Sequence, residues 1–231
     1  MYRGDKMFKY ETHLHTSPAS RCAHATVEES LAFYKSLGYD GVFITNHFYE
    51  GEDKKGKSYE EMMNSHFADY ENGLEFGKTI GIKVFFGAEI TYNGTDFLVY
   101  GLDKEWFFDH PEIEEMKIRD KLSFMAESGA LIIQAHPFRE ASYIDHIRLF
   151  PRNIHGVEII NASRSDEENN MAKHYAEQYS LLKFAGSDNH TASKRTKLAG
   201  VCCAEPVCDV EDFIEKVKNH KADIFTLTNE I

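Results

Sequence analysis

The stretch YETHLHT at residues 10–16 determines how the rest of the chain is interpreted, because it places two histidines, His13 and His15, two positions apart. They stand at the end of a predicted first strand over residues 8–15. Alternate residues of a strand point to the same face of a sheet, so we expect both imidazoles to aim at one point. Two converging nitrogen donors provide half of a tetrahedral metal site. The pair alone is equally compatible with ordinary surface or core histidines.

Length and composition indicate a single domain spanning residues 1–231, with enough apolar residues (42%) for a substantial core. The net charge of −12 disfavours long nucleic acids and anionic membranes as partners. A small anionic substrate stays compatible, because bound divalent cations would reverse the charge locally. No apolar run reaches the roughly 18 residues of a membrane span, and residues 1–6 lack the apolar core of a signal peptide. Four cysteines without a CxxC pair favour reduced thiols, so we expect a cytoplasmic protein. The sequence does not indicate the oligomeric state.

Short apolar segments alternate with amphipathic helical segments along the chain. We predict strands over residues 8–15, 41–45, 83–88, 96–101, 130–135, 156–160, 182–185, 200–204 and 224–227, and helices over 26–37, 59–80, 111–128, 166–179 and 209–219. Residues 89–92 and 96–101 are expected to form a hairpin through Asn93-Gly94. The alternation is typical of βα units around a mainly parallel sheet. About seven such repeats in one domain favour an α/β fold with a closed barrel.

Metal-binding residue types follow five of the predicted strands, at the point where each strand ends. In a parallel barrel all these ends lie on one rim, so a metal site is expected there. The set contains imidazoles and carboxylates without thiolate, which favours zinc, manganese or iron. It exceeds one tetrahedral shell, so the site is expected to be multinuclear, with Glu89 as a bridge, and suited to activating water for an in-line displacement. These residues are His13, His15, His47, Glu89, His136, Asp188 and His190.

The same residues, in their order and spacing, resemble the PHP (polymerase and histidinol phosphatase) phosphoesterases. The matching motifs are HxHT at 13–16, TNH at 45–47, GxE at 87–89, AHPFR at 135–139 and SDxH at 187–190. The resemblance covers most of the chain, from residue 13 to residue 190. It implies a distorted seven-stranded TIM-like (β/α) barrel that hydrolyses phosphoesters with two to three divalent metal ions.

The resemblance also implies a distribution of ligands among the ions. A first ion would be held by His13, His15, Glu89 and Asp188, a second by Glu89 and His136, and a third by His47 and His190. The segment CAHA at residues 22–25 resembles a Cys-Gly-His-Ala segment of the histidinol phosphatase branch, which adds His24 to the third ion. A surface histidine is the alternative interpretation of His24.

Two positions depart from the family pattern. Asn46 stands where the family usually has aspartate in Thr-Asp-His, and we expect this to change hydrogen bonding around the ligands more than ligation itself. Where the family often has a histidine shortly after the glutamate, this chain has Asp96, which could bind the second ion instead. His110 is the alternative ligand, unless it is a solvated residue at a helix start.

A phosphate substrate also needs cationic side chains. Arg139 and Arg164 both follow predicted strands and are the candidates, with Ser163 as a neutral donor; Lys194, Arg195 and Lys197 form a further basic cluster that is equally compatible with a solvated surface. The expected reaction is attack on phosphorus by a metal-activated hydroxide. Arg139 would hold the phosphate, and Asp188 or His190 would assist proton transfer to the leaving group.

Other functions stay open at this point. The segment at 22–25 suggests histidinol phosphate or another small phosphorylated substrate, whereas the segment at 135–139 resembles members that act on nucleotides or short oligonucleotides. An amidohydrolase-type barrel also begins with HxH, but no lysine follows a strand here as its bridging ligand would. A degenerate barrel retained as a metal-binding module is the non-enzymatic alternative. Fold alone does not decide among these substrates.

Overall fold

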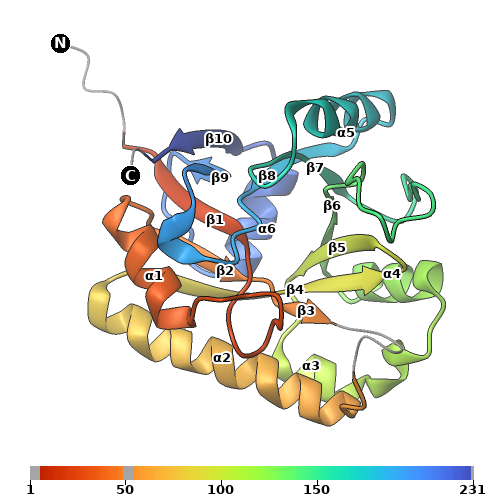
Figure 1. Ribbon diagram of the computed structural model, residues 1–231, viewed down its shortest axis with the longest axis horizontal. Helices are drawn as coiled ribbons and strands as arrows, with labels where there is room; N and C mark the ends of the chain where they lie inside the picture. The colour runs from red at the N-terminus through yellow and green to blue at the C-terminus, as the bar shows by residue number, and fades with distance from the viewer. Residues whose placement is uncertain (1–5, 49–54, 230–231) are drawn as a thin grey trace.

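A computed structural model describes residues 6–48 and 55–229, and for Lys194 the backbone alone (Figure 1). The predicted absence of a signal peptide concerns residues almost all of which lie outside this range. The elements are β1 (Phe8–Leu14), α1 (Val27–Ser36), β2 (Gly41–Ile44), β3 (His47–Phe48), α2 (Tyr59–Ile80), β4 (Lys83–Tyr92), β5 (Thr95–Tyr100), α3 (Lys104–Asp109), η2 (Pro111–Glu114), α4 (Ile118–Glu127), β6 (Leu131–Ala135), β7 (Gly156–Asn161), α5 (Asp166–Gln178), β8 (Leu182–Gly186), η3 (Ala192–Lys194), β9 (Lys197–Cys203), α6 (Val210–Lys218) and β10 (Ala222–Thr228).

One sheet of ten strands runs β10-β9-β1-β2-β4-β5-β6-β7-β8, with β3 paired to β4. The pairs β1–β2, β2–β4, β3–β4, β6–β7 and β7–β8 are parallel. The pairs β1–β9, β9–β10, β4–β5 and β5–β6 are antiparallel. The predicted α/β barrel is confirmed, but with more strands than seven and a more mixed sheet than the alternation of elements suggested. Figure 1 shows α2 along one side of the sheet and α5 on the opposite side.

The barrel closes near the carboxyl end of β1. The hydroxyl of Thr12 donates to the carbonyl of Ala185 at the end of β8. Beyond it, the amide of His15 donates to the carbonyl of Asn189 over 3.0 Å, and the amide of Asn189 donates to the carbonyl of His13 over 3.3 Å. These bonds join the segment after β8 to the His13–His15 segment, so the first and last predicted ligand motifs lie side by side.

Aromatic side chains fill the opposite end of the barrel. The ring of Phe213, on α6, lies 4.3 Å from that of Phe43 on β2, and Phe43 lies 4.7 Å from Phe85 on β4. All three side chains are buried, as is Tyr100, whose hydroxyl donates to the carbonyl of Thr12 over 2.7 Å. This packed layer leaves the carboxyl ends of the parallel strands as the open end of the barrel.

Local sequence signals account for several element boundaries. An N-terminal capping box begins α1, with Thr26 and Glu29 satisfying each other's backbone N–H groups. The Asn93-Gly94 turn joins β4 to β5 as expected, with positive φ at both residues, which suits a tight hairpin. Across the described residues, no helix is both long and apolar enough to cross a bilayer.

The single helix predicted over residues 111–128 is wrong. Asp103 caps a separate short helix, α3, and Pro111 opens a 3-10 turn, η2, before α4 begins after Lys117. Proline restricts the residue before it and lacks an N–H group, so α3 ends at that point. The apolar periodicity continued across the break and concealed it.

Candidate metal centre

The predicted ligands gather at the open end of the barrel, on or just after the strands that precede them. His13 belongs to β1 and His15 follows it; His47 lies on β3, Glu89 on β4 and Asp96 on β5; His136 follows β6, and Asp188 and His190 follow β8. Four groups among the described residues have ligand atoms within 4.8 Å of one another. They are His13–Glu89–His136, His13–His15–Asp188, His47–Glu89–Asp96 and His15–Cys22–His47–His190.

The Glu89 carboxylate lies at the centre of these groups. One oxygen lies 3.2 Å from His13 Nε2 and 3.4 Å from His136 Nε2; the other lies 3.3 Å from His15 Nε2 and 2.8 Å from His47 Nδ1. Glu89 is fully buried, yet neither oxygen accepts a hydrogen bond of acceptable geometry from a described residue. A buried carboxylate without donors is costly unless a cation compensates it.

His13 and His15 also form an arrangement that a cation would stabilise. His13 Nδ1 lies 2.9 Å from the carboxylate oxygen Glu158 Oε1, to which it donates, and His15 Nδ1 lies 3.2 Å from Ser20 Oγ. Their Nε2 atoms then face each other at 3.1 Å. A metal ion between or beside the two rings would accept a lone pair from each Nε2. The donor set and its unsatisfied atoms therefore fit divalent metal ions.

Carboxylates and imidazoles in this cluster shift each other's pKa values strongly. Burial by itself lowers the pKa of His13, but the carboxylates of Glu158, Asp188 and Glu89 outweigh it and raise that pKa well above its usual value. Conversely, burial raises the pKa of Asp188, but the neighbouring histidines, His13 above all, outweigh it and hold that pKa well below its usual range. The lowered pKa keeps Asp188 ionised and available to a cation.

Glu158, on β7, was missed by sequence reasoning. Besides His13 Nδ1, it accepts the backbone N–H of His136 over 3.0 Å and a side-chain N–H of Asn161 over 2.8 Å. It therefore fixes the ring of one predicted ligand and the backbone of another. Its signal in the sequence was a charged residue inside the apolar strand GVEII, a position where an unpaired charge is rarely buried.

Strained backbone accompanies two of the predicted ligands. His136 has φ of 24° and Asp188 has φ of 51°, values that residues other than glycine rarely adopt. Such conformations persist where surrounding contacts impose them and concentrate at functional sites. The strain agrees with the position of both residues in the cluster.

Asn46 stands where the family pattern has an aspartate, and its side chain forms hydrogen bonds near the candidate ligands, as we expected from the sequence. Its Oδ1 accepts the backbone N–H of Thr16 over 2.8 Å, and its Nδ2 donates to Thr16 Oγ1 over 2.9 Å and to Asp69 Oδ2 over 3.1 Å. Asp69, on α2, also accepts from the Thr16 hydroxyl. The Asp69 carboxylate, from helix α2, thus joins the hydrogen-bond network of residue 46, the position at which the family pattern has an aspartate. No sequence motif pointed to Asp69.

The loop at residues 22–25 presents a different side chain from the expected one. His24 is exposed and belongs to none of the four groups, whereas Cys22 belongs to the group with His15, His47 and His190. Burial raises the pKa of the Cys22 thiol, but interactions with His190 and His47 outweigh it and lower that pKa to about 5. This group therefore adds a cysteine to the imidazoles and carboxylates considered from the sequence.

Asp96 and His110 are the alternative ligands for the second ion, and their positions in the structure favour Asp96. Asp96 is buried in the group with His47 and Glu89, and its Oδ2 lies 3.8 Å from His136 Nε2. His110 lies apart from all four groups and has its Nδ1 2.9 Å from the exposed Glu112.

A cavity of about 700 Å³ opens over the cluster. It is lined by Arg21, Cys22, His47, Lys55, Thr91, Gly94, Asp96, His136, Arg139, Tyr143, Arg164, Asp188 and His190. Ser163 is not in this lining, and its hydroxyl donates to the carbonyls of Ser187 and Asp188. Of the further basic cluster, Arg195 donates to the Asp188 carbonyl over 3.3 Å and Lys197 pairs with Asp166; the side chain of Lys194 lies outside the described part.

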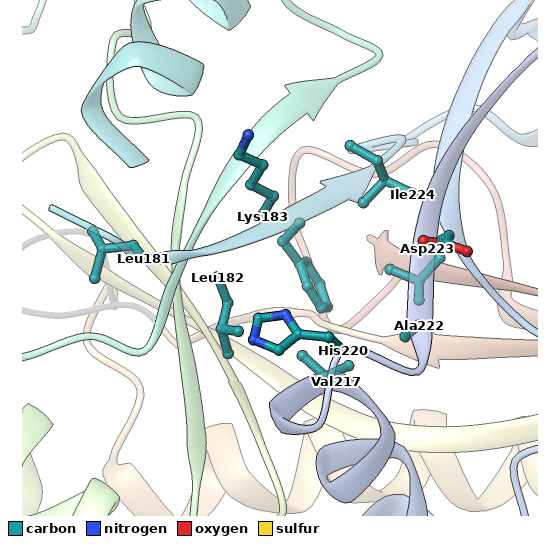
Figure 2. Close-up of a pocket in the computed structure, with 10 residues that line it drawn as sticks. Leu181, Leu182, Lys183, Val217, His220, Ala222, Asp223 and Ile224 are labelled. Carbon is teal, nitrogen blue, oxygen red and sulfur yellow. The ribbon is translucent and has the colours of Figure 1, made fainter. Parts of the chain in front are cut away.

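Figure 2 shows a second cavity, of about 350 Å³, between β8, β10 and the end of α6. Its lining is largely apolar, with Leu182 and Val217 beside the single imidazole of His220. None of the four candidate ligand groups includes a residue of this lining. Of these two cavities, the one over Glu89 is therefore the one lined by candidate metal ligands.

Three solved structures share the fold. One is a two-domain protein from Bacteroides vulgatus described as containing a predicted PHP-like metal-dependent phosphoesterase, with 16% identity and a TM-score of 0.70 over 95% of this chain; this chain spans 65% of its length. PsfC from Pseudomonas syringae has 18% identity and a TM-score of 0.64 over 97% of this chain and 92% of its own. An amidohydrolase from Chromobacterium violaceum has 12% identity and a TM-score of 0.55 over 94% of this chain and 97% of its own.

At the level of sequence, no curated protein matches the chain. Residues 166–222, from the start of α5 to the start of β10, match a family model described as PHP-associated. The solved structures, at these identities, establish the fold. The chain is thus similar to PHP-type proteins in its fold, and over residues 166–222 in its sequence.

Proposed function

We propose that the protein is a metal-dependent phosphoesterase that hydrolyses a small phosphorylated substrate. The observation that carries the proposal is the position of two arginines, Arg139 and Arg164, in the same cavity as the ligand groups. The Nε atoms of both are buried and have no hydrogen-bond acceptor among the described residues. A phosphate dianion would satisfy such guanidinium groups while its other oxygens face the metal cluster.

Arg139 is held in place from two sides. Its guanidinium lies 3.0 Å from Asp96 Oδ2 and 5.6 Å from the ring centroid of Tyr143. Burial lowers the pKa of Arg139, but Asp96, with smaller contributions from Tyr143 and Glu89, outweighs it and raises that pKa, so the group stays cationic. A positioned cation of this kind orients a phosphoryl group without reorganising during the reaction.

The metal ions would be held by the His13, His15, Glu89, Asp96, His136 and Asp188 side chains, with His47 and His190 beside them. Bound divalent ions lower the pKa of water and neutralise charge on a phosphoryl group. The two candidates for proton transfer to the leaving alkoxide, Asp188 and His190, both line the cavity. Both also belong to candidate ligand groups, where a bound ion would take the place of the proton.

The size of the substrate is inferred from charge and shape. The chain has a net charge of −12, while the cavity gathers Arg21, Lys55, Arg139 and Arg164 at its mouth and walls. Local positive charge on an acidic molecule favours a compact anion over a long polyanion. Phosphomonoesters, histidinol phosphate included, are therefore the first class proposed, and nucleotides are the second.

The test is hydrolysis of a panel of esters by the full chain supplied with Mn²⁺ or Zn²⁺. The panel contains para-nitrophenyl phosphate, histidinol phosphate, nucleoside monophosphates, nucleoside 3′,5′-bisphosphates and, as the amidohydrolase arm, N-acyl amino acids. His13→Ala should abolish phosphate release, and His174→Ala, at a histidine exposed on α5, should not. Equal phosphate release by the wild type and His13→Ala, or cleavage of the amides alone, would overturn the proposal.

A further inference from the structure

The loop between β1 and α1 directs a cysteine toward the metal cluster. Cys22 has its sulfur within 4.8 Å of ligand nitrogens of His15, His47 and His190, and it lines the cavity above them. The other cysteines are placed elsewhere: Cys202 and Cys203 belong to β9, and Cys208 is exposed and follows it.

Backbone hydrogen bonds hold this loop against the cluster. The amide of His24 donates to the carbonyl of His190 over 2.7 Å, so the residues flanking the thiol are joined to one of its imidazole neighbours. The amide of Ala23 donates to the carbonyl of Ser20 over 3.1 Å, and the amide of Ser17 donates to the carbonyl of Ala25 over 2.9 Å. The hydroxyl of Ser20 in turn contacts His15 Nδ1 and accepts the amide of His47 over 3.0 Å. The cysteine is thus positioned by the same network as the imidazoles.

We propose that Cys22 binds a metal ion as a thiolate, together with His47 and His190. Two imidazole nitrogens and one thiolate, completed by a water molecule or a substrate oxygen, form a tetrahedral set for zinc, and one that also accepts cobalt. The groups around Glu89 and Asp188 differ, because each contains carboxylate oxygen and none contains sulfur, and they also suit harder ions such as manganese. The cluster therefore contains one position selective for a soft ion beside positions that are less selective.

This inference rests on the metal centre of the proposed function, but its readouts detect the metal–sulfur bond and do not require turnover. Failure of the phosphoesterase proposal would leave them unchanged. Failure of the thiolate proposal would leave phosphate release possible, with the remaining ligands intact.

The experiment is cobalt titration of the metal-free full chain, followed by absorption spectroscopy and metal analysis. We expect a thiolate-to-cobalt charge-transfer band in the near ultraviolet in the wild type. Cys22→Ser should lose this band and one equivalent of tightly bound zinc per chain. The matched control Cys208→Ser, at an exposed cysteine beyond the cluster, should retain both.

A second variant covers the case in which serine disturbs the loop. Cys22→His should restore the lost equivalent of zinc without restoring the band, because it supplies a nitrogen in place of sulfur. A band of unchanged intensity in Cys22→Ser would overturn the proposal. So would an unchanged zinc content in that variant, or loss of the band in Cys208→Ser.

Discussion

Replacement of Glu158 by glutamine is the sharpest test of how the second layer of the site orients its ligands. The buried carboxylate accepts three hydrogen bonds, from His13 Nδ1, His136 N and Asn161 Nδ2, at 2.9, 3.0 and 2.8 Å. Glutamine has one acceptor oxygen, and its NH₂ group would face a donor. His13 would then lose the partner that fixes its tautomer and leaves Nε2 available to a metal ion.

The expected loss is 10- to 100-fold in metal affinity, the usual effect of removing such an outer hydrogen-bond partner. This corresponds to about 1.4–2.8 kcal/mol of binding free energy. Competition against a chromophoric chelator measures it directly, without any assumption about the substrate. Far-ultraviolet circular dichroism and a melting curve of the metal-free variant establish that the fold is retained.

Glu11→Gln is the matched control. Glu11 is equally buried, but one of its oxygens accepts the backbone amides of Thr12, His13 and Ser187 and the other has no partner among the described residues. A glutamine can keep those bonds and place its NH₂ at the unpaired position. If Glu158→Gln bound metal as tightly as Glu11→Gln and the wild type, the reasoning about Glu158 would be refuted.

Three further predictions address stability and substrate binding. A divalent metal ion at 100 times its Kd should stabilise the fold by about 2.7 kcal/mol per site, which raises Tm by roughly 5–10 °C in calorimetry. A chelator should reverse this rise, and an unchanged Tm would count against metal binding. Burial lowers the pKa of His66 to about 4, so the unfolded chain takes up its proton first and stability is lost as pH falls from about 6.5 toward 4. The expected loss is about 2 kcal/mol at pH 5, and chemical denaturation should show it in the wild type but not in His66→Gln. Arg139→Gln should lower kcat/KM about 10- to 100-fold, the value of a charge-assisted hydrogen bond, whereas the exposed Arg152→Gln should leave it unchanged.

The positions of the candidate ligands were predictable because they lie on, or just after, the strands that present them. His13, Glu89 and Asp188 are far apart in sequence but occupy the same position relative to a parallel strand, and the closed sheet brings such positions together. Residue type then restricts the chemistry, since imidazole and carboxylate in one place suit divalent metals.

The supporting residues were not predictable in this way. Glu158 and Asp69 act through partners that are remote in sequence and come from a strand interior and a helix face, where no local pattern marks them. The exchange of His24 for Cys22 has a similar cause. Both residues are exposed, and hydrogen bonds of the loop backbone, such as that from the His24 amide to the His190 carbonyl, place Cys22 rather than His24 beside the imidazoles.

The central claim is that the groups around Glu89 bind divalent metal ions. Anomalous X-ray diffraction at the zinc edge, from crystals of the zinc-loaded full chain, tests it most directly. We predict peaks at about 2.0–2.2 Å from the Glu89 oxygens and from imidazole nitrogens of His13 and His136. Zinc-loaded crystals in which every peak lies elsewhere on the molecule, with the Glu89 carboxylate in contact only with protein atoms, would contradict the account.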